Sequence, residues 1–286
     1  MHVTLLLCIS ALVLNITTVL LKFNYLTSVL FVMGGVSLIA LSYSFQFLRW
    51  VDFKSMGIFV LLSNVTTTII EKLMIVFDVW GFSSSNAGLI GLNFWGAPIE
   101  EYIYWWMAPV VVVTTYLAVS KRGNLKVKVE NQLPILLDFG LLSAIFKFGS
   151  EKIEESAVKT DKVYLENQGV TNENSKHVNR KYERGGKVPV WSFVVAFVLA
   201  CLTFGYFFFR GSYKVVLATV LVFVLVAYPN ELYSLYQGYW VYNNNKMLGV
   251  WVLWVPLEEW FMYTASPAAG SMLFSAYREY VHKLKE

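Results

Sequence analysis

Apolar stretches, each about as long as the segment needed to cross a lipid bilayer, recur along most of this chain. A transmembrane helix requires about 20 consecutive residues that are mainly apolar. Seven segments meet that requirement: 3–21, 27–47, 57–77, 88–119, 188–209, 213–236 and 247–275. Charged residues make up 15% of the 286 residues, whereas soluble domains have about 25%. The sequence therefore predicts an all-α, polytopic membrane protein.

An eighth apolar segment, 133–149, is shorter than the other seven and contains Asp138 and Lys147. The polar and highly charged residues 150–187 that follow are typical of a solvated linker. If the eighth segment also crosses the membrane, most lysines and arginines of the short loops fall on the side of the N-terminus, as expected for cytoplasmic loops. We therefore expect seven or eight transmembrane helices and a multi-pass location in the cell membrane.

The residues that the sequence lacks exclude several classes of site. Its three histidines, His2, His177 and His282, lie outside the apolar segments, so a histidine-rich iron site within the membrane is excluded. Cys8 and Cys201 lack the spacing of a metal site, and neither the G-x-G-x-x-G nor the G-x-S-x-G motif occurs. The formal charge of +4 is spread among loops, unlike the basic stripe of a nucleic-acid-binding protein. We expect no metal, no cofactor and no nucleic-acid partner, whereas the sequence permits self-association.

The sequence contains an internal repeat. Residues 80–109 align with residues 240–267 when a gap of two residues is allowed. Each segment contains a tryptophan, a polar triplet, a glycine, several aromatic residues and the motif Pro-x-Glu-Glu. In both segments a second proline follows the motif proline by eleven residues, and a glutamate stands nine residues before the tryptophan. Agreement at several spaced features indicates a duplicated unit.

The repeat predicts two tandem homologous halves. Residues 1–130 would form the first repeat with about four spans, and residues 188–286 would belong to the second. Residues 131–187 would supply a marginal span at 133–149, the first of the second repeat, and then the charged linker. Four spans in each half would give both halves the same orientation, related by a pseudo-two-fold axis along the membrane normal. The two Pro-x-Glu-Glu motifs would then lie at one depth and share a central site.

The motif prolines, Pro98 and Pro256, are expected to begin helical segments near the membrane centre. Counted from a span start at Gly88, Pro98 lies about 15 Å along a helix, half of a hydrocarbon core about 30 Å thick. Proline lacks an N–H group and disfavours helix at the residue before it, so it suits the first position of a helix. The two glutamates that follow each proline would occupy the first helical turn.

Four carboxyl groups in an apolar setting suggest acid–base chemistry. Burial favours the neutral acid, and adjacent carboxyls resist being ionised together. We therefore expect each of the pairs, Glu100 with Glu101 and Glu258 with Glu259, to combine a proton donor with a proton acceptor. Acidic residues within a membrane are expensive and usually functional, and their duplication weakens a purely structural interpretation.

Aromatic residues are dense around both motifs. Their π faces stabilise cations that have no hydrogen-bond donors, although some of these side chains would instead face lipid or fill the core. Acids and π faces in a dry site suit the protonation of an alkene and the protection of a carbocation. The predicted substrate-binding residues are Trp80, Trp95, Tyr102, Trp105, Trp240, Trp254, Trp260 and Tyr263.

The duplicated "PIEE" and "PLEE" motifs, each preceded by aromatic residues and a short polar loop, resemble those of the membrane-integral lycopene cyclases. In that family two small subunits are separate in many bacteria and fused in archaea, and the resemblance covers 27–120 and 188–280. It implies a lycopene β-cyclase, an intramolecular lyase or isomerase that converts lycopene in the bilayer to γ- and then β-carotene without net redox change. The resemblance also implies the catalytic carboxyl groups, which are those of Glu100, Glu101, Glu258, Glu259, Glu71 and Glu231. At the positions of Glu71 and Glu231 the family more often has aspartate.

Two other classes of function remain compatible with the residues. A proton- or cation-coupled transporter would also use duplicated halves and carboxyl groups near the midplane. A non-catalytic carotenoid-binding membrane protein would use the aromatic residues but has no need of four acids. The sequence leaves open which glutamate donates the proton, whether one or two rings form, and whether the ring is of the β or the ε type.

Overall fold

The structure is a computed structural model that describes residues 2–82, 89–90, 92–120, 190–243 and 246–284. Its long helices are α1 (His2–Leu21), α4 (Trp50–Val76), α5 (Ile99–Ser120), α9 (Val190–Phe208), α10 (Tyr213–Gln237) and α11 (Leu257–Lys283). A further rod is continuous through α2 (Tyr25–Val29), a π-helical turn (Leu30–Gly34), α3 (Gly35–Ser44) and a 3-10 turn (Phe45–Phe47). Five of the described helical segments are long and apolar enough to cross a membrane: His2–Leu21, Tyr25–Phe47, Trp50–Val76, Ile99–Ser120 and Tyr213–Gln237. The prediction of an all-α membrane protein is confirmed.

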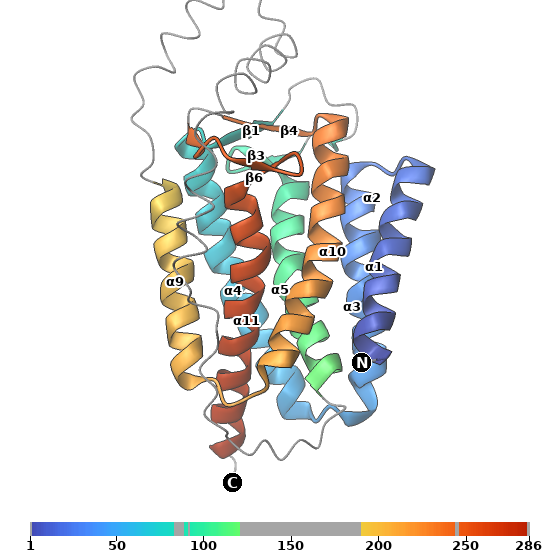
Figure 1. The fold of residues 1–286 in the computed structure, drawn as a ribbon, viewed down its shortest axis with the longest axis vertical. Helices are drawn as coiled ribbons and strands as arrows, with labels where there is room; N and C mark the ends of the chain where they lie inside the picture. Colours follow the sequence, from blue (N-terminus) through green and yellow to red (C-terminus); the bar gives the residue numbers. More distant parts are fainter. Residues whose placement is uncertain (1, 83–88, 91, 121–189, 244–245, 285–286) are drawn as a thin grey trace, which may run out of the picture.

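The helices stand side by side and carry short strands at one end of the bundle (Figure 1). Helices α4, α5, α10 and α11 form an inner group in which each packs against two or more of the others. Helix α3 packs on α5, α9 packs on α11, and α1 packs on α10. The inner group therefore consists of two equivalent pairs, α4 with α5 from the first half and α10 with α11 from the second.

A strand pair joins the two halves across a pseudo-two-fold axis. Strand β1 (Trp80–Phe82) pairs with β4 (Trp240–Tyr242) in antiparallel register, with Trp80 opposite Tyr242, Gly81 opposite Val241 and Phe82 opposite Trp240. In the repeat, β1 and β4 are equivalent, so that Trp80 corresponds to Trp240 and Phe82 corresponds to Tyr242. The two cross-strand pairs at the ends of the strands are therefore equivalent to each other, as a two-fold axis requires. The axis consequently passes between Gly81 and Val241.

Equivalent helices run in the same direction. Helices α4 and α10 run toward the strand end of the bundle, whereas α5, α9 and α11 run away from it (Figure 1). Helix α5 therefore ends at the end of the bundle away from the strands, whereas α9 begins at the strand end. This is the direction expected of two tandem halves in one orientation. The span predicted at 133–149 lies outside the described residues, and the exact repeat boundaries remain predictions.

Each motif proline closes a β-hairpin before its helix starts. Strand β2 (Asn93–Phe94) pairs with β3 (Ala97–Pro98), and β5 (Trp251–Val252) pairs with β6 (Val255–Pro256). Both two-residue turns have positive φ at both positions, as in a type I′ turn: Trp95 at 50° and Gly96 at 92°, then Leu253 at 48° and Trp254 at 64°. The second turn has no glycine, so its left-handed backbone costs more than that of the first.

The predicted start of the two motif-bearing spans is wrong. The apolar residues before each proline form a loop and a hairpin, so the helices begin at Ile99 and Leu257 instead of near residues 88 and 247. The reason is that proline cannot donate a hydrogen bond within a helix and disfavours helix at the residue before it, so the helix starts only after the proline. The glutamate pairs consequently lie at one end of the bundle, beneath the strands, and not halfway along a span.

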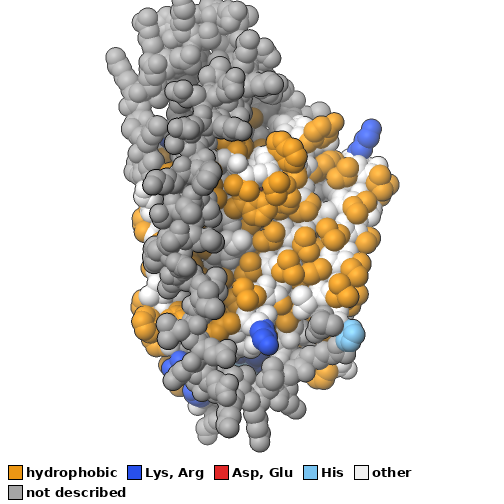
Figure 2. Space-filling view, in the orientation of Figure 1, with side chains coloured by type: hydrophobic (Ala, Val, Ile, Leu, Met, Phe, Trp, Pro, Cys, Tyr) orange, Lys and Arg blue, Asp and Glu red, His pale blue; other side chains and the backbone are white. Residues whose placement is uncertain are grey.

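The two ends of the bundle differ in charge. The end opposite the strands carries most of the described basic residues, whereas Lys22, Lys72 and Lys246 lie toward the strand end. Between the ends, Figure 2 shows hydrophobic side chains spread over the face of the molecule that is drawn. The basic residues at the end opposite the strands are Arg49, Lys54, Arg210, Lys214, Arg278 and Lys283. The sequence prediction of a cytoplasmic N-terminus corresponds to this basic end.

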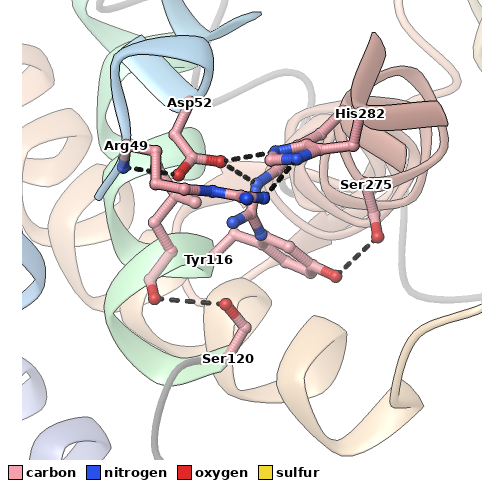
Figure 3. A network of polar contacts seen from close by, with 8 residues as sticks. Arg49, Asp52, Tyr116, Ser120, Ser275 and His282 are labelled. Carbon is pink, nitrogen blue, oxygen red and sulfur yellow. Dashed lines mark hydrogen bonds and ion pairs between the residues drawn. The ribbon is translucent and has the colours of Figure 1, made fainter. Parts of the chain in front are cut away.

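A polar network ties α4 to α11 at the basic end (Figure 3). The buried carboxylate of Asp52, in the first turn of α4, accepts hydrogen bonds from the backbone N–H of Arg49 at 2.8 Å and from Nε of Arg278 at 2.5 Å. Nε2 of His282 lies 3.0 Å from the same carboxylate, and the Arg49 guanidinium contacts the other ring nitrogen of His282. The network therefore fixes the start of α4 against the last turns of α11.

Candidate active site

All six candidate carboxyl groups are buried at the strand end of the inner helix group. Glu71 and Glu231 lie in the last two turns of α4 and α10, whereas the Pro-x-Glu-Glu glutamates lie in the first turns of α5 and α11. Free backbone N–H groups and the helix dipole at a helix start can stabilise a carboxylate there. The strand pair β1–β4 covers this end of the bundle (Figure 1).

The two glutamates of each pair have different surroundings. The carboxyl of Glu100 accepts a hydrogen bond from the backbone N–H of Ile90, and that of Glu258 accepts the equivalent bond from Leu248. Each bond spans ten residues and fastens the loop before the hairpin to the helix start. The second glutamate of each pair, Glu101 or Glu259, instead points toward the centre of the inner helix group. This arrangement differs from the prediction that the two glutamates of a pair act together.

Carboxyl groups from both halves meet in one small cavity. Glu101, Glu231 and Glu259 line a cavity of about 20 Å³. Such a volume accommodates about one water molecule. The other lining residues are aromatic, and three come from each half: Trp80, Tyr104, Trp105, Trp240, Tyr242 and Tyr263. The predicted central site shared by the two repeats thus corresponds to a cavity whose walls come from both.

Two indole–carboxyl hydrogen bonds repeat across the pseudo-two-fold axis. Nε1 of Trp80 donates to Glu71 at 3.1 Å, and Nε1 of Trp240 donates to Glu231 at 3.0 Å. Glu231 also accepts a hydrogen bond from the hydroxyl of Tyr242. Burial raises the pKa of Tyr242 well above its usual value, and the nearby charge of Glu231 raises this pKa further, so Tyr242 keeps its proton as a donor.

Glu101 and Glu259 occupy equivalent positions but differ in their hydrogen bonds. Glu101 accepts a bond of 2.7 Å from the hydroxyl of Tyr25 and one of 3.0 Å from Nε1 of Trp105. No side chain or backbone group among the described residues donates a hydrogen bond to Glu259. Glu259 does lie within electrostatic range of Glu231 and Glu101. The cavity is therefore asymmetric in its chemistry although its framework is symmetric.

The predicted aromatic residues divide between the cavity and its surroundings. Trp80, Trp105, Trp240 and Tyr263 line the cavity. The other four lie elsewhere. Tyr102 packs edge-on against Phe94 with ring centroids 5.2 Å apart, and Nε1 of Trp260 donates to the carbonyl of Val252 at 2.9 Å.

Trp95 and Trp254 lie in the hairpin turns and not at the cavity. Their side chains are 55% and 76% exposed, respectively. Trp95 stacks on Phe94 with ring centroids 5.6 Å apart. Amphipathic aromatic side chains at such positions suit the boundary between bilayer and water.

Sequence reasoning did not select three tyrosines that surround the carboxyl groups: Tyr25, Tyr104 and Tyr242. Tyr25 comes from α2, 76 residues before its partner Glu101, and has no motif around it. Tyr104 was one of many aromatic residues beside the first motif, with nothing to distinguish it. Tyr242 carried a usable signal, because the repeat has Phe82 at the equivalent position and the second half gains a hydroxyl group there.

The bundle and its cavity define a class of protein: an all-α membrane protein with one internal site of carboxyl and aromatic groups shared by tandem halves. The chain belongs to the lycopene cyclase family, because the family's sequence profile, described as "Lycopene cyclase", matches residues 22–119 and 188–277. One matched region lies in each half, which agrees with the tandem repeat. No curated protein and no solved structure matches the chain. The family supports an enzyme of carotenoid cyclisation.

Proposed function

We propose that the protein is a multi-pass lycopene β-cyclase of the cell membrane, which converts the linear ends of lycopene to β rings by way of γ-carotene. The observation that carries this proposal is that Glu101, Glu231 and Glu259, from both halves, face one cavity with aromatic walls. Two carboxyl groups around the same space allow one of them to donate a proton and the other to remove a proton at the same substrate end.

Glu259 is the proton donor in this proposal. A carboxylate is stabilised by hydrogen bonds from N–H and O–H groups, and a buried carboxyl without such donors is better accommodated as the neutral acid. Glu259 receives no such bond among the described residues, whereas Glu101 receives two. Protonated Glu259 would give its proton to C2 of the terminal C1=C2 bond, which leaves a cation at C1.

Ring closure and proton loss complete the reaction. The C5=C6 bond attacks C1, so that a C1–C6 bond forms and the positive charge moves to C5. Loss of the proton from C6 then gives the C5=C6 double bond of the β ring. Glu101 is the acceptor in this proposal, because the hydrogen bonds from Tyr25 and Trp105 favour the carboxylate over the neutral acid and hold the group in one position. One proton enters and one leaves, so the product is an isomer of the substrate.

The aromatic walls protect the cationic intermediates. The π faces of Tyr104, Trp105 and Tyr263 supply negative charge density without offering a nucleophile. Exclusion of water prevents capture of a cation as an alcohol. A return of the proton from Glu101 to Glu259 resets the site, and Glu231, which lines the same cavity, is the proposed relay.

Expression in a bacterium that accumulates lycopene tests this function. Pigments are separated by chromatography, and the protein is quantified in the membrane fraction. Conversion of lycopene to γ- and β-carotene is the expected result. Unchanged lycopene in cells that contain the folded protein in their membranes would overturn the proposal.

A further inference from the structure

A second, larger cavity lies directly below the carboxyl cavity. It has a volume of about 290 Å³ and lies between α4, α5, α9 and α11. Every side chain that lines it is uncharged, and small residues such as Thr66, Ala108 and Ser266 leave the space open. We refer to this space as the lateral groove.

The lateral groove and the carboxyl cavity share a wall. Tyr104, Trp105 and Tyr263 line both spaces. The groove therefore ends at the three side chains proposed to stabilise the cationic intermediates. Because the carboxyl cavity accommodates about one water molecule, a substrate end can enter only if some of these three side chains move.

The lateral groove is long and apolar. Along α11 its lining extends from Met262 to Leu273, a separation of eleven residues, or about 16 Å at 1.5 Å per residue. An extended apolar chain suits a groove of this length and lining.

We propose that the lateral groove binds the linear polyene chain of the substrate, so that one end group passes Tyr104, Trp105 and Tyr263 into the carboxyl cavity. This inference rests on the proposed cyclase function. Because the groove approaches the site from one side, the two ends of a long polyene react one after the other, with release or reversal of the chain between the two cyclisations.

Two substitutions that fill the groove test this proposal, with a matched control two residues away. Ser266→Phe narrows the groove near the carboxyl cavity, and Leu273→Trp narrows its far end. Thr264→Phe adds similar bulk to an exposed position of α11 outside the lining. For lycopene, both groove variants are expected to lower kcat/KM by about tenfold or more, mainly through KM, as for a loss of substrate binding. Thr264→Phe is expected to behave as the wild type.

A short acyclic isoprenoid with the same end group separates chain binding from misfolding. Its chain does not reach Leu273, so Leu273→Trp is expected to convert it normally while converting lycopene poorly. Equal loss with both substrates would overturn the proposal, because the defect would then lie in folding or chemistry. Normal conversion of lycopene by both groove variants would also overturn it, and a lipid chain would then be the better occupant.

Cys201 offers a test of occupancy that leaves the groove unaltered. It lines the groove, whereas Cys8, the other cysteine of the sequence, lies on α1. In a Cys8→Ala variant, lycopene in the membrane is expected to slow alkylation of Cys201 by an apolar maleimide. Unchanged alkylation would contradict binding in the groove. Protection without any conversion of lycopene would overturn the cyclase function and leave the binding site in place.

Discussion

The hydroxyl of Tyr25 donates a 2.7 Å hydrogen bond to Glu101 and thereby joins α2 to the first turn of α5 in the buried interior. Together with Nε1 of Trp105 on the other oxygen, it leaves Glu101 with fixed donors on both sides. In the second half, Glu259 has no such partner among the described residues. A duplicated framework has thus acquired two different carboxyl groups, which is the basis for assigning one as acid and one as base.

Removal of the Tyr25 hydroxyl tests the proposed base. Tyr25→Phe is expected to lower kcat by about tenfold or more, because a hydrogen bond to a charged group contributes roughly 1.5–3 kcal/mol. Pigment conversion per amount of membrane protein measures the effect. Tyr280→Phe, which changes an exposed tyrosine in the last turns of α11, is the control. An unaltered rate in Tyr25→Phe would show that this bond does not hold Glu101 for catalysis.

Substitutions of Glu258 test whether the two glutamates of a pair have different roles, with Glu258 holding the loop and Glu259 facing the cavity. Glu258→Gln keeps an oxygen that can accept the bond from Leu248, whereas Glu258→Ala removes it and leaves the N–H unpaired. We expect Glu258→Ala to lose about 1–3 kcal/mol of stability and Glu258→Gln to lose much less. Thermal unfolding of the detergent-purified proteins measures the difference. If Glu258→Gln were as stable as the wild type but wholly inactive, Glu258 would take part in the chemistry, and its role would not be limited to holding the loop at Leu248.

The Asp52 network predicts a loss of stability far from the carboxyl cavity. Asp52→Asn leaves the Arg278 guanidinium without its counter-charge at a buried position, and loss of one partner from such a pair costs about 3–5 kcal/mol when both are buried. Because the side chain of Arg278 is 24% exposed, we expect the lower end of that range or less. The unfolding temperature of Asp52→Asn is compared with that of Glu279→Gln, which removes a solvent-exposed ion pair with Lys283. Equal unfolding temperatures would contradict a structural role for the network.

The second hairpin turn predicts a substitution that stabilises the protein. Trp254 has a φ of 64°, and the equivalent position in the first half is Gly96 with a φ of 92°. Glycine adopts this conformation without steric cost, so Trp254→Gly is expected to raise the unfolding temperature slightly. A lower unfolding temperature would mean that the exposed indole contributes more through its contacts than the backbone loses through strain.

Several features of the site could be predicted from the sequence because they depend on local rules. The repeat predicted the equivalence of the two halves. Pro98 and Pro256, expected at the first helical positions, lie one residue before α5 and α11 begin, at Ile99 and Leu257. Glu71 and Glu231 stand nine residues before Trp80 and Trp240, and in both halves that spacing corresponds to a hydrogen bond. A motif that is duplicated with its spacing intact therefore carried structural information.

Other features depend on tertiary packing and could not be predicted in this way. The apolar residues before Pro98 fit a helix as well as a hairpin by composition alone, which placed the glutamates too deep. Within each pair, the helix rotation decides which carboxyl faces the cavity, and that rotation is set by the neighbouring helices. The contact of Tyr25 with Glu101 joins distant segments, and no sequence pattern marks it.

The most direct measurement of the central claim is the conversion of lycopene in deuterated water by the wild type, Glu259→Gln and Glu101→Gln, with deuterium located in the products by mass spectrometry and NMR. We expect the wild type to place one deuterium at C2 of each new ring, and Glu259→Gln to form no cyclic product. Glu101→Gln should still take up deuterium at C2 but give slow turnover and rings that have lost a proton from other positions. The account would be contradicted by normal, deuterium-labelled β-carotene from Glu259→Gln that is folded in the membrane.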